Sequence, residues 1–297
     1  MTTPFVVGAY AILPPERAEH GSFYAALPAW VTGLEIPWKL EVGMDPDPAW
    51  FAAQVARFTD SVLTLIPATM VSIGSDPWFG LASPDADGRA AALAMAREAL
   101  DAVERLHEDA GAAVVRWVHV HSGPSDRAES GPFERSLGEL ADDFARVGVR
   151  PVIEHCDAAA GVGPGEKRFL TLADEAAVAS EVGAAVTLNW GRSVLESHDP
   201  DTPRAQVAEL VAAGLLGGLM FSGAGGEATQ YGGPWADAHL PLSTDEPASL
   251  MTPAHVAACV AAAGGAELYR GAKVQAPASA SVAERVGMLG RIRAAMV

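Results

Sequence analysis

Eight short apolar segments recur along the chain, and alanine-rich stretches with helical spacing separate them. Nearly continuous apolar character is typical of parallel strands buried on both faces. Strands that alternate with helical stretches indicate repeated βαβ units. We predict strands at Phe5–Ala11, Gly33–Trp38, Ser61–Pro67, Val115–Ser122, Arg150–Cys156, Ala184–Trp190, Leu216–Ser222 and Glu267–Val274. Eight such units in 297 residues predict one (β/α)8, or TIM, barrel, a fold that needs roughly 250 residues.

Helix boundaries follow from caps and apolar stripes. We predict a helix over Pro48–Phe58 and a longer one over Arg89–His107, which Gly111 ends. Thr171 is a predicted N-cap, and Thr252-Pro253 begins a further helix with a capping residue and a proline in its first turn.

Two intervals between strands are longer than the rest. The extra segments, at about 68–88 and 223–249, are rich in Gly, Pro, Ser and Asp, and they carry Trp78 and Trp235. Both follow a strand, which places them on the face of a barrel where active sites lie. We predict loops that form lids or pocket walls. No change in composition marks a boundary, so we expect one domain over residues 1–297.

The formal net charge of −17 disfavours nucleic acid and anionic membrane as partners. It leaves room for a phosphorylated small substrate. Two cysteines without CxxC spacing, no signal-peptide pattern and no apolar run of membrane-spanning length indicate a cytoplasmic protein. We expect a small-molecule, sugar-like ligand, and a homo-oligomer is compatible with the sequence.

Polar side chains end most of the predicted strands, at positions where a barrel usually carries Val, Ile or Leu. These residues are Glu35, Trp38, His119, His121, Glu154, Asn189, Trp190, Arg192 and Lys273. Their convergence on one barrel mouth favours a site. Because side chains alternate along a strand, His119 and His121 share a face. Glu154 and His155 must diverge, and we expect Glu154 to point inward.

Two further features fall in the loops. Asp237-Ala238-His239 has the spacing to supply two metal ligands, or to orient a histidine as a base. Trp38, Trp78, Trp190 and Trp235 lie at predicted strand ends or in the long loops, where aromatic faces suit stacking on a sugar. Ordinary loop packing explains the tryptophans equally well.

At these strand ends the sequence resembles the xylose-isomerase-like superfamily, which includes sugar isomerases, sugar epimerases, related dehydratases and endonuclease IV. The resemblance covers essentially the whole chain. The stretches Gly33-Leu34-Glu35-Ile36-Pro37, Asn189-Trp190-Gly191-Arg192-Ser193 and Phe221-Ser222-Gly223-Ala224 look like a branch catalogued only as a domain of unknown function.

The resemblance implies ligand positions that this chain keeps only in part. Glu154 matches a metal-ligand glutamate of sugar isomerases. His121-Ser122-Gly123 and Asp237-Ala238-His239 resemble ligand positions of endonuclease IV. The usual Asp, His and Glu of strands six, seven and eight are replaced by Asn189, Ser222 and Lys273 with Gln275.

Two site chemistries follow. A rebuilt site for Zn or Mn would use His121, Glu154, Asp237 and His239. Alternatively no metal is used, and Lys273 and Arg192 supply the positive charge. We favour the second.

We predict a sugar isomerase- or epimerase-like enzyme that transfers a proton next to a carbonyl. Glu154 would be the base, His121 or His239 the acid, and Lys273 and Arg192 the oxyanion stabilisers. The predicted substrate-binding residues are Glu35, Trp38, Asn189, Trp190 and Trp235, with Glu35 able to act as a second base. The alternatives are a metal-assisted hydrolase or lyase, using His121, Glu154, Asp237 and His239, and a non-catalytic carbohydrate-binding barrel.

Overall fold

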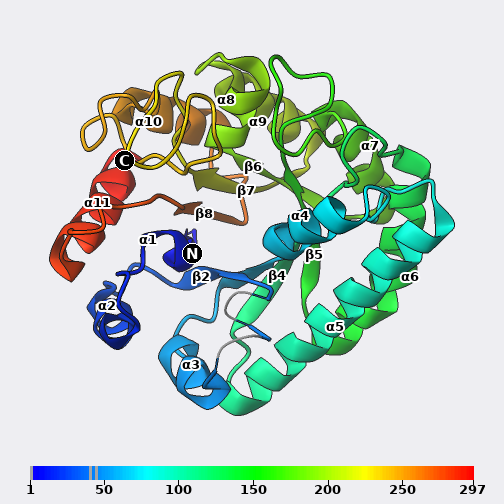
Figure 1. Cartoon of the computed structure of the whole chain (residues 1–297), viewed down its shortest axis with the longest axis horizontal. Coiled ribbons are helices and arrows are strands. Elements are labelled where there is room, and N and C mark those ends of the chain that lie inside the picture. The colour runs from blue at the N-terminus through cyan, green and yellow to red at the C-terminus, as the bar shows by residue number, and fades with distance from the viewer. Residues whose placement is uncertain (1–2, 40–41, 44–45) are drawn as a thin grey trace.

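A computed structural model describes residues 3–39, 42–43 and 46–297. Its eight strands are all parallel and pair in sequence order, and β1 pairs with β8, so the sheet closes (Figure 1). The strands are β1 (Phe5–Val7), β2 (Gly33–Pro37), β3 (Ser61–Thr64), β4 (Val115–Val120), β5 (Arg150–His155), β6 (Ala185–Asn189), β7 (Leu216–Phe221) and β8 (Tyr269–Ala272). The prediction of a (β/α)8 barrel is confirmed.

The helices surround the strands (Figure 1). They are α1 (Ala9–Ile12), α2 (His20–Ala26), α3 (Pro48–Val55), α4 (Ile66–Ser75), α5 (Ala86–Ala110), α6 (Ser130–Val147), α7 (Leu172–Val182), α8 (Trp190–Ser197), α9 (Thr202–Ala213), α10 (Pro253–Ala263) and α11 (Val282–Ala294), with a 3-10 helix η1 (Arg17–Glu19) before α2. None of the helices among the described residues has the length and apolar character needed to cross a membrane.

The predicted caps are confirmed. Thr171 accepts a hydrogen bond from the backbone N–H of Asp174 at the start of α7, and Thr252 accepts one from His255 at the start of α10. Gly111 ends α5 at a φ of 64°, a left-handed conformation that glycine adopts without steric cost.

Two element predictions were wrong. The first strand ends at Val7, and Ala9–Ile12 is a short helix. The segment 68–88 is not mainly a loop, because α4 covers Ile66–Ser75 and α5 begins at Ala86. Pro67, which we placed at the end of a strand, lies in the first turn of α4, where its fixed φ favours the helix.

Both segments nevertheless lie at the barrel mouth. Ile66 of α4 packs with Cys156 and Phe169, and Ile73 lies against the same cluster. Helix α4 therefore forms one wall of the barrel mouth. The segment 223–249 contains no helix or strand, as predicted. Backbone hydrogen bonds in both directions between Gly223 and Leu240, at 2.7 and 2.9 Å, close residues 223–240 into a loop.

An apolar layer closes the lower part of the barrel interior. We call it the barrel floor, and its buried members are Val6, Val62, Trp117, Val152, Met220 and Tyr269. The Tyr269 hydroxyl hydrogen-bonds to His119 Nε2 and to Thr187 Oγ1, 2.5 Å from each. Because side chains of one strand face alternate sides, the next inward residues along the strands lie above this floor, and four of them are polar: Thr64, His119, Glu154 and Ser222.

We expect Tyr269→Phe to lower the free energy of unfolding by about 1–3 kcal/mol, because it leaves His119 and Thr187 without their shared buried partner. Urea unfolding followed by circular dichroism measures the change. Tyr231→Phe, in the partly exposed loop after β7, is the control and should change stability by less than about 0.5 kcal/mol. Equal stability of the Tyr269→Phe variant and the wild type would contradict the role given to this hydroxyl.

Candidate active site

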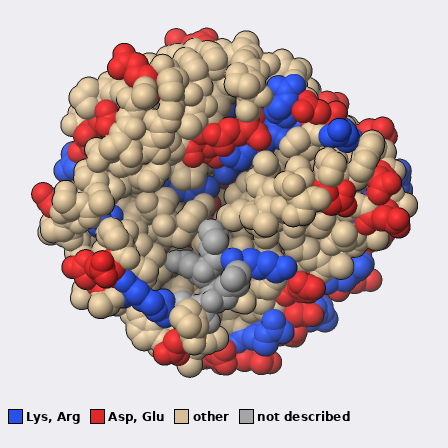
Figure 2. Space-filling model, in the orientation of Figure 1, with Lys and Arg blue, Asp and Glu red and all other residues tan. Residues whose placement is uncertain are grey.

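Polar side chains from four strands, and from the segments that follow β4, β6, β7 and β8, meet above the barrel floor at the carboxyl ends of the strands. We call them the mouth cluster: Glu35, His119, His121, Glu154, Asn189, Arg192, Asp237, His239 and Lys273. Figure 2 shows the surface hollowed near the middle of the barrel, with basic and acidic side chains at the edge of the hollow. Both Glu35 and Glu154 are fully buried, as is Lys273, so their charges must be balanced inside the protein.

Glu154, at the end of β5, is the centre of the cluster. Its Oε2 lies 2.8 Å from His121 Nε2 and 3.6 Å from His119 Nδ1, and its Oε1 lies 2.8 Å from Arg192 Nη1. Burial alone would raise the pKa of Glu154, but the charges of Arg192 and Lys273 hold it well below its usual range. Glu154 is therefore ionised at neutral pH.

His121 is neutral at the same pH. Burial lowers its pKa to about 4, although its contact with Glu154 acts in the opposite direction. Because an ionised carboxylate only accepts hydrogen bonds, the neutral ring must donate its Nε2–H to Glu154.

Arg192 extends from the first turn of α8, which begins directly where β6 ends. Its Nη1 also lies 3.3 Å from Cys156 Sγ, and its Nε lies 3.1 Å from Asp237 Oδ2. The side chain is 2% exposed. One buried guanidinium therefore joins the carboxylates of Glu154 and Asp237.

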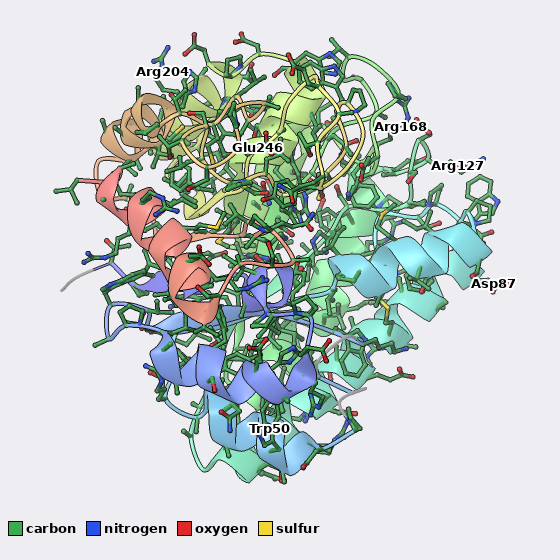
Figure 3. The ribbon with its side chains drawn as sticks, turned by 60° about the vertical axis from the view of Figure 1, so that its left-hand side comes forward. Trp50, Asp87, Arg127, Arg168, Arg204 and Glu246 are labelled. Carbon is green, nitrogen blue, oxygen red and sulfur yellow. The ribbon has the colours of Figure 1, made fainter. Side chains whose placement is uncertain are left out.

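Asp237 lies in the long loop after β7. Its Oδ2 accepts a hydrogen bond from Lys167 Nζ at 2.8 Å, and its backbone N–H donates to Glu166 Oε1 at 2.7 Å. Lys167 and Glu166 belong to the loop between β5 and α7. In Figure 3 the loops that carry Arg168 and Glu246 lie together at one end of the barrel. The two loops are thus tied together across the mouth.

His239 is the most accessible histidine of the cluster, with a side chain 15% exposed. Its Nδ1 lies 2.8 Å from Ser222 Oγ and 3.2 Å from Asp237 Oδ1. Because both contacts use the same ring nitrogen, these residues do not form a serine–histidine–aspartate relay. His239 and Trp235 adopt positive φ values of 48° and 56°. Such conformations are unfavourable for these residue types and are often kept at functional sites.

Glu35 and Lys273 form a second buried pair on the other side of Glu154. Lys273 Nζ donates to Glu35 Oε1 at 2.8 Å, and the Tyr10 hydroxyl donates to the same oxygen at 3.1 Å. Burial alone would lower the pKa of Lys273, but Glu35 holds it above its usual range. A Cβ added at Gly8 would lie 2.6 Å from Lys273 Cγ, so only glycine leaves room for this side chain.

Several buried polar atoms of the cluster have no hydrogen-bond partner among the described residues. They are both amide atoms of Asn189, Glu35 Oε2, His119 Nδ1, His121 Nδ1 and Glu154 Oε1, the last of which lies in an ion pair with Arg192. Buried polar groups are normally satisfied, because each unpaired one costs free energy. This group has the donor and acceptor character that a ligand with several hydroxyls would satisfy.

His155, the neighbour of Glu154, points out of the barrel, as strand alternation predicts. Its Nδ1 lies 2.6 Å from Glu175 Oε2 and its Nε2 lies 3.1 Å from Glu196 Oε2. Burial alone would lower the pKa of His155, but the two carboxylates raise it to about 10. A buried imidazolium therefore ties β5 to α7 and α8.

The four tryptophans that the sequence placed at strand ends or in the long loops lie in different environments. Trp190 is the first residue of α8 and stacks on His255 of α10, with ring centroids 5.7 Å apart. It lies in the helical layer, so we leave it out of the proposed site. Trp235 stacks on His198 at 3.7 Å, in the loop that carries Asp237. Trp38 is buried at the end of β2, and Trp78 is 42% exposed.

Sequence reasoning missed Tyr10, Cys156 and Lys167. Tyr10 was placed inside the first strand, whereas it lies one helical turn beyond that strand, at the mouth. Examining the end of every predicted strand would have found it. Lys167 lies far along a loop, and no sequence signal places it near Asp237.

The four predicted metal ligands do not come together. The guanidinium of Arg192 lies between Glu154 and Asp237. Two other sets bring three ligand atoms within 4.8 Å of one another: His121, Glu154 and Cys156, and Glu35, His119 and Glu154. In each set a fixed cation already contacts a ligand, Arg192 in the first and Lys273 in the second. Divalent ions prefer sites with unpaired anionic ligands, so neither set fits one as it stands.

Comparisons with known proteins agree with the barrel. A family model described as Domain of unknown function (DUF4862) matches residues 6–288. A Salmonella typhimurium protein described as uncharacterized protein STM3670 is 30% identical over 300 residues, covering 97% of this chain and 94% of that protein.

Solved structures of xylose isomerase domain proteins are among the matches. The 3-keto-D-glucoside 4-epimerase YcjR from E. coli superposes with a TM-score of 0.62 at 13% identity, covering 99% of this chain and all 100% of that chain. The IolI protein with a binding zinc atom gives 0.60 at 10% identity, with 99% and 98% covered. At these identities the likeness shows the fold, a xylose-isomerase-like TIM barrel.

The pKa of His155 predicts a loss of stability at alkaline pH. A group whose pKa is higher in the folded chain stabilises the fold below its unfolded value, about 6.5, and this contribution is lost as pH rises toward 10. We expect the free energy of unfolding to fall by about 3 kcal/mol between pH 7 and 9.5. In His155→Gln this slope should disappear, whereas the control His20→Gln, at a partly buried position in α2, should retain it. A His155→Gln variant with the wild-type slope would refute the buried imidazolium.

Proposed function

We propose a function for this chain, which belongs to the family described as Domain of unknown function (DUF4862), from the geometry of its mouth cluster. In this proposal the chain is a sugar isomerase- or epimerase-like enzyme. It removes and returns a proton at the carbon next to a carbonyl of a carbohydrate or related polyol. The observation that carries this proposal is the buried, ionised Glu154 held between a neutral histidine and a fixed guanidinium.

Glu154 is the base in this proposal. Its low pKa reflects the positive charges around it rather than exposure to water. When it accepts a proton from the substrate, the negative charge moves to the substrate oxygen, and Arg192 and Lys273 are close enough to stabilise it there. The total charge of the site does not change during the step, and the stabilising groups are already fixed in place.

Glu35 is the second carboxylate of the reaction. One of its oxygens and one of Glu154 belong to the same set of atoms within 4.8 Å. Glu35 Oε2 accepts no hydrogen bond from the described residues, so it is free to receive a substrate hydroxyl or a proton. His239, whose ring is partly exposed, is the donor nearest to solvent. Glu154 takes the proton and returns it once protonated, with Glu35 as the alternative carboxylate, and His239, neutral at pH 7, serves as the acid only in its minor protonated form.

The charges of the site favour an uncharged substrate. Three buried carboxylates, Glu35, Glu154 and Asp237, are matched by three cations, Lys167, Arg192 and Lys273. Burial lowers the pKa of His119 and His239, so these rings add no charge at neutral pH. Within the part of the mouth that the structure describes, no cation of the cluster is left over for a phosphate or a carboxylate of the ligand, whereas the unpaired atoms of Asn189 suit hydroxyls.

The test is proton exchange with solvent. We would incubate D-tagatose, D-psicose and D-fructose with the protein in D2O and follow deuterium at the carbon beside the carbonyl by NMR. D-fructose 6-phosphate serves as the charged comparison. We expect exchange for at least one uncharged sugar and a weaker rate with the phosphate ester. Glu154→Gln should lose at least about 100-fold of the rate, because it removes the base.

Glu139→Gln is the matched control, since the same substitution is made on the exposed face of α6 outside the barrel, and its rate should stay within about threefold of wild type. Exchange that survives in Glu154→Gln would overturn the assignment of the base. Sugar binding without any exchange would instead support a non-catalytic carbohydrate-binding barrel.

A further inference from the structure

Arg192 contacts three side chains of kinds that commonly bind divalent metals. Its guanidinium lies 2.8 Å from Glu154 Oε1, 3.3 Å from Cys156 Sγ and 3.1 Å from Asp237 Oδ2. His121 Nε2 is on the other oxygen of the same Glu154 carboxylate, at 2.8 Å. A carboxylate, a thiol, a second carboxylate and an imidazole thus surround one buried cation.

These groups also match a metal site in composition. His121, Glu154 and Cys156 bring their ligand atoms within 4.8 Å of one another. Nitrogen, oxygen and sulfur ligands of this kind make tetrahedral sites for Zn²⁺, with bonds of about 2.0–2.3 Å. Asp237 faces the same guanidinium from the β7–α10 loop, so its carboxylate is placed to be a fourth ligand.

The guanidinium prevents such a site from forming. An ion bonded to Glu154 and Cys156 would need the space that Arg192 fills, and it would meet a side chain that stays charged at any ordinary pH. The buried side chain has no route to solvent within its present packing, since it is 2% exposed. Repulsion between charges a few ångströms apart is strong in such surroundings.

We propose that Arg192 takes the place of a divalent metal ion in this barrel, so that removing its guanidinium would uncover a metal site formed by His121, Glu154, Cys156 and Asp237. The inference concerns the site alone and does not depend on the proposed sugar chemistry. Lys273 pairs with Glu35 in the same way that Arg192 pairs with Glu154. The test changes Arg192 only, so that the Glu35–Lys273 pair stays intact.

The experiment is a titration of untagged protein with Co²⁺, a spectroscopic substitute for Zn²⁺. The proteins are the wild type, Arg192→Leu, Arg192→Leu with Cys156→Ser, and the control Arg116→Leu, whose arginine pairs with Asp60 away from the mouth. We expect one Co²⁺ per chain in Arg192→Leu, with a thiolate-to-cobalt charge-transfer band. The band should be absent in the double variant, in the control and in the wild type.

Thermal unfolding provides the second readout. Arg192→Leu leaves the buried carboxylate of Glu154 without its contacting cation, which destabilises a protein strongly. Zn²⁺ should raise its melting temperature by several degrees, because a ligand bound only to the folded state stabilises that state. The same Zn²⁺ concentration should leave the wild type and Arg116→Leu unchanged. If Arg192→Leu does not fold in the absence of metal, its refolding with Zn²⁺ present measures the same effect.

Two results would overturn the proposal. One is stoichiometric Co²⁺ binding by the wild type that Glu154→Gln abolishes, because the metal would then bind beside the guanidinium. The other is a folded Arg192→Leu chain that binds no Co²⁺. Neither depends on sugar turnover, so an inactive wild type in the exchange assay leaves this test intact.

Discussion

The ion pair between Glu154 and Arg192 is the interaction on which the mouth of this barrel depends. A carboxylate buried without a partner is strongly unfavourable, and Glu154 is fully buried at the end of β5. Arg192 makes its charge tolerable and at the same time reaches Asp237 in the β7–α10 loop. The guanidinium thus fixes the position of that loop and, together with Lys273, keeps Glu154 ionised, while burial keeps His121 neutral.

The same arrangement links the chemistry to the loops that cover it. Asp237 contacts Arg192 on one side and Lys167 on the other, so the loops after β5 and β7 meet at one carboxylate. The stacking of Trp235 on His198 adds a second contact between the covering segments. The loops that cover the mouth are therefore fixed by the same carboxylates and cations that form its cluster.

The sequence was sufficient for the barrel and for the inward face of its strands. Buried parallel strands are apolar on both faces, so all eight were recognisable, and the period of two placed Glu154 inward and His155 outward. The sequence was insufficient where the exact last residue of a strand decides which way a side chain points. Trp190 was assigned to the mouth as the last residue of a strand, but the strand ends at Asn189 and the helix turns the tryptophan into the outer layer. Pro67 was likewise assigned to the end of a strand, although β3 ends at Thr64 and Pro67 lies in the first turn of α4.

The position of Arg192 between Glu154 and Asp237 could not be predicted either. Residues from strand five, strand six and the loop after strand seven meet there, and a sequence gives no distances between them. The replaced ligand positions were the useful guide, because they indicated that Arg192 and Lys273 could supply positive charge without showing which carboxylate each one contacts.

The account is tested most directly by the protonation states of the histidines beside Glu154. The chain has eight histidines, and ¹⁵N NMR of imidazole-labelled protein, with His121→Gln to assign the signal, reports each ring. We predict that His121 is neutral at pH 7, protonated on Nε2, and gains its second proton only near pH 4. An imidazolium at pH 7 would mean that His121, rather than Arg192 and Lys273, balances the charge of Glu154, and it would contradict the account.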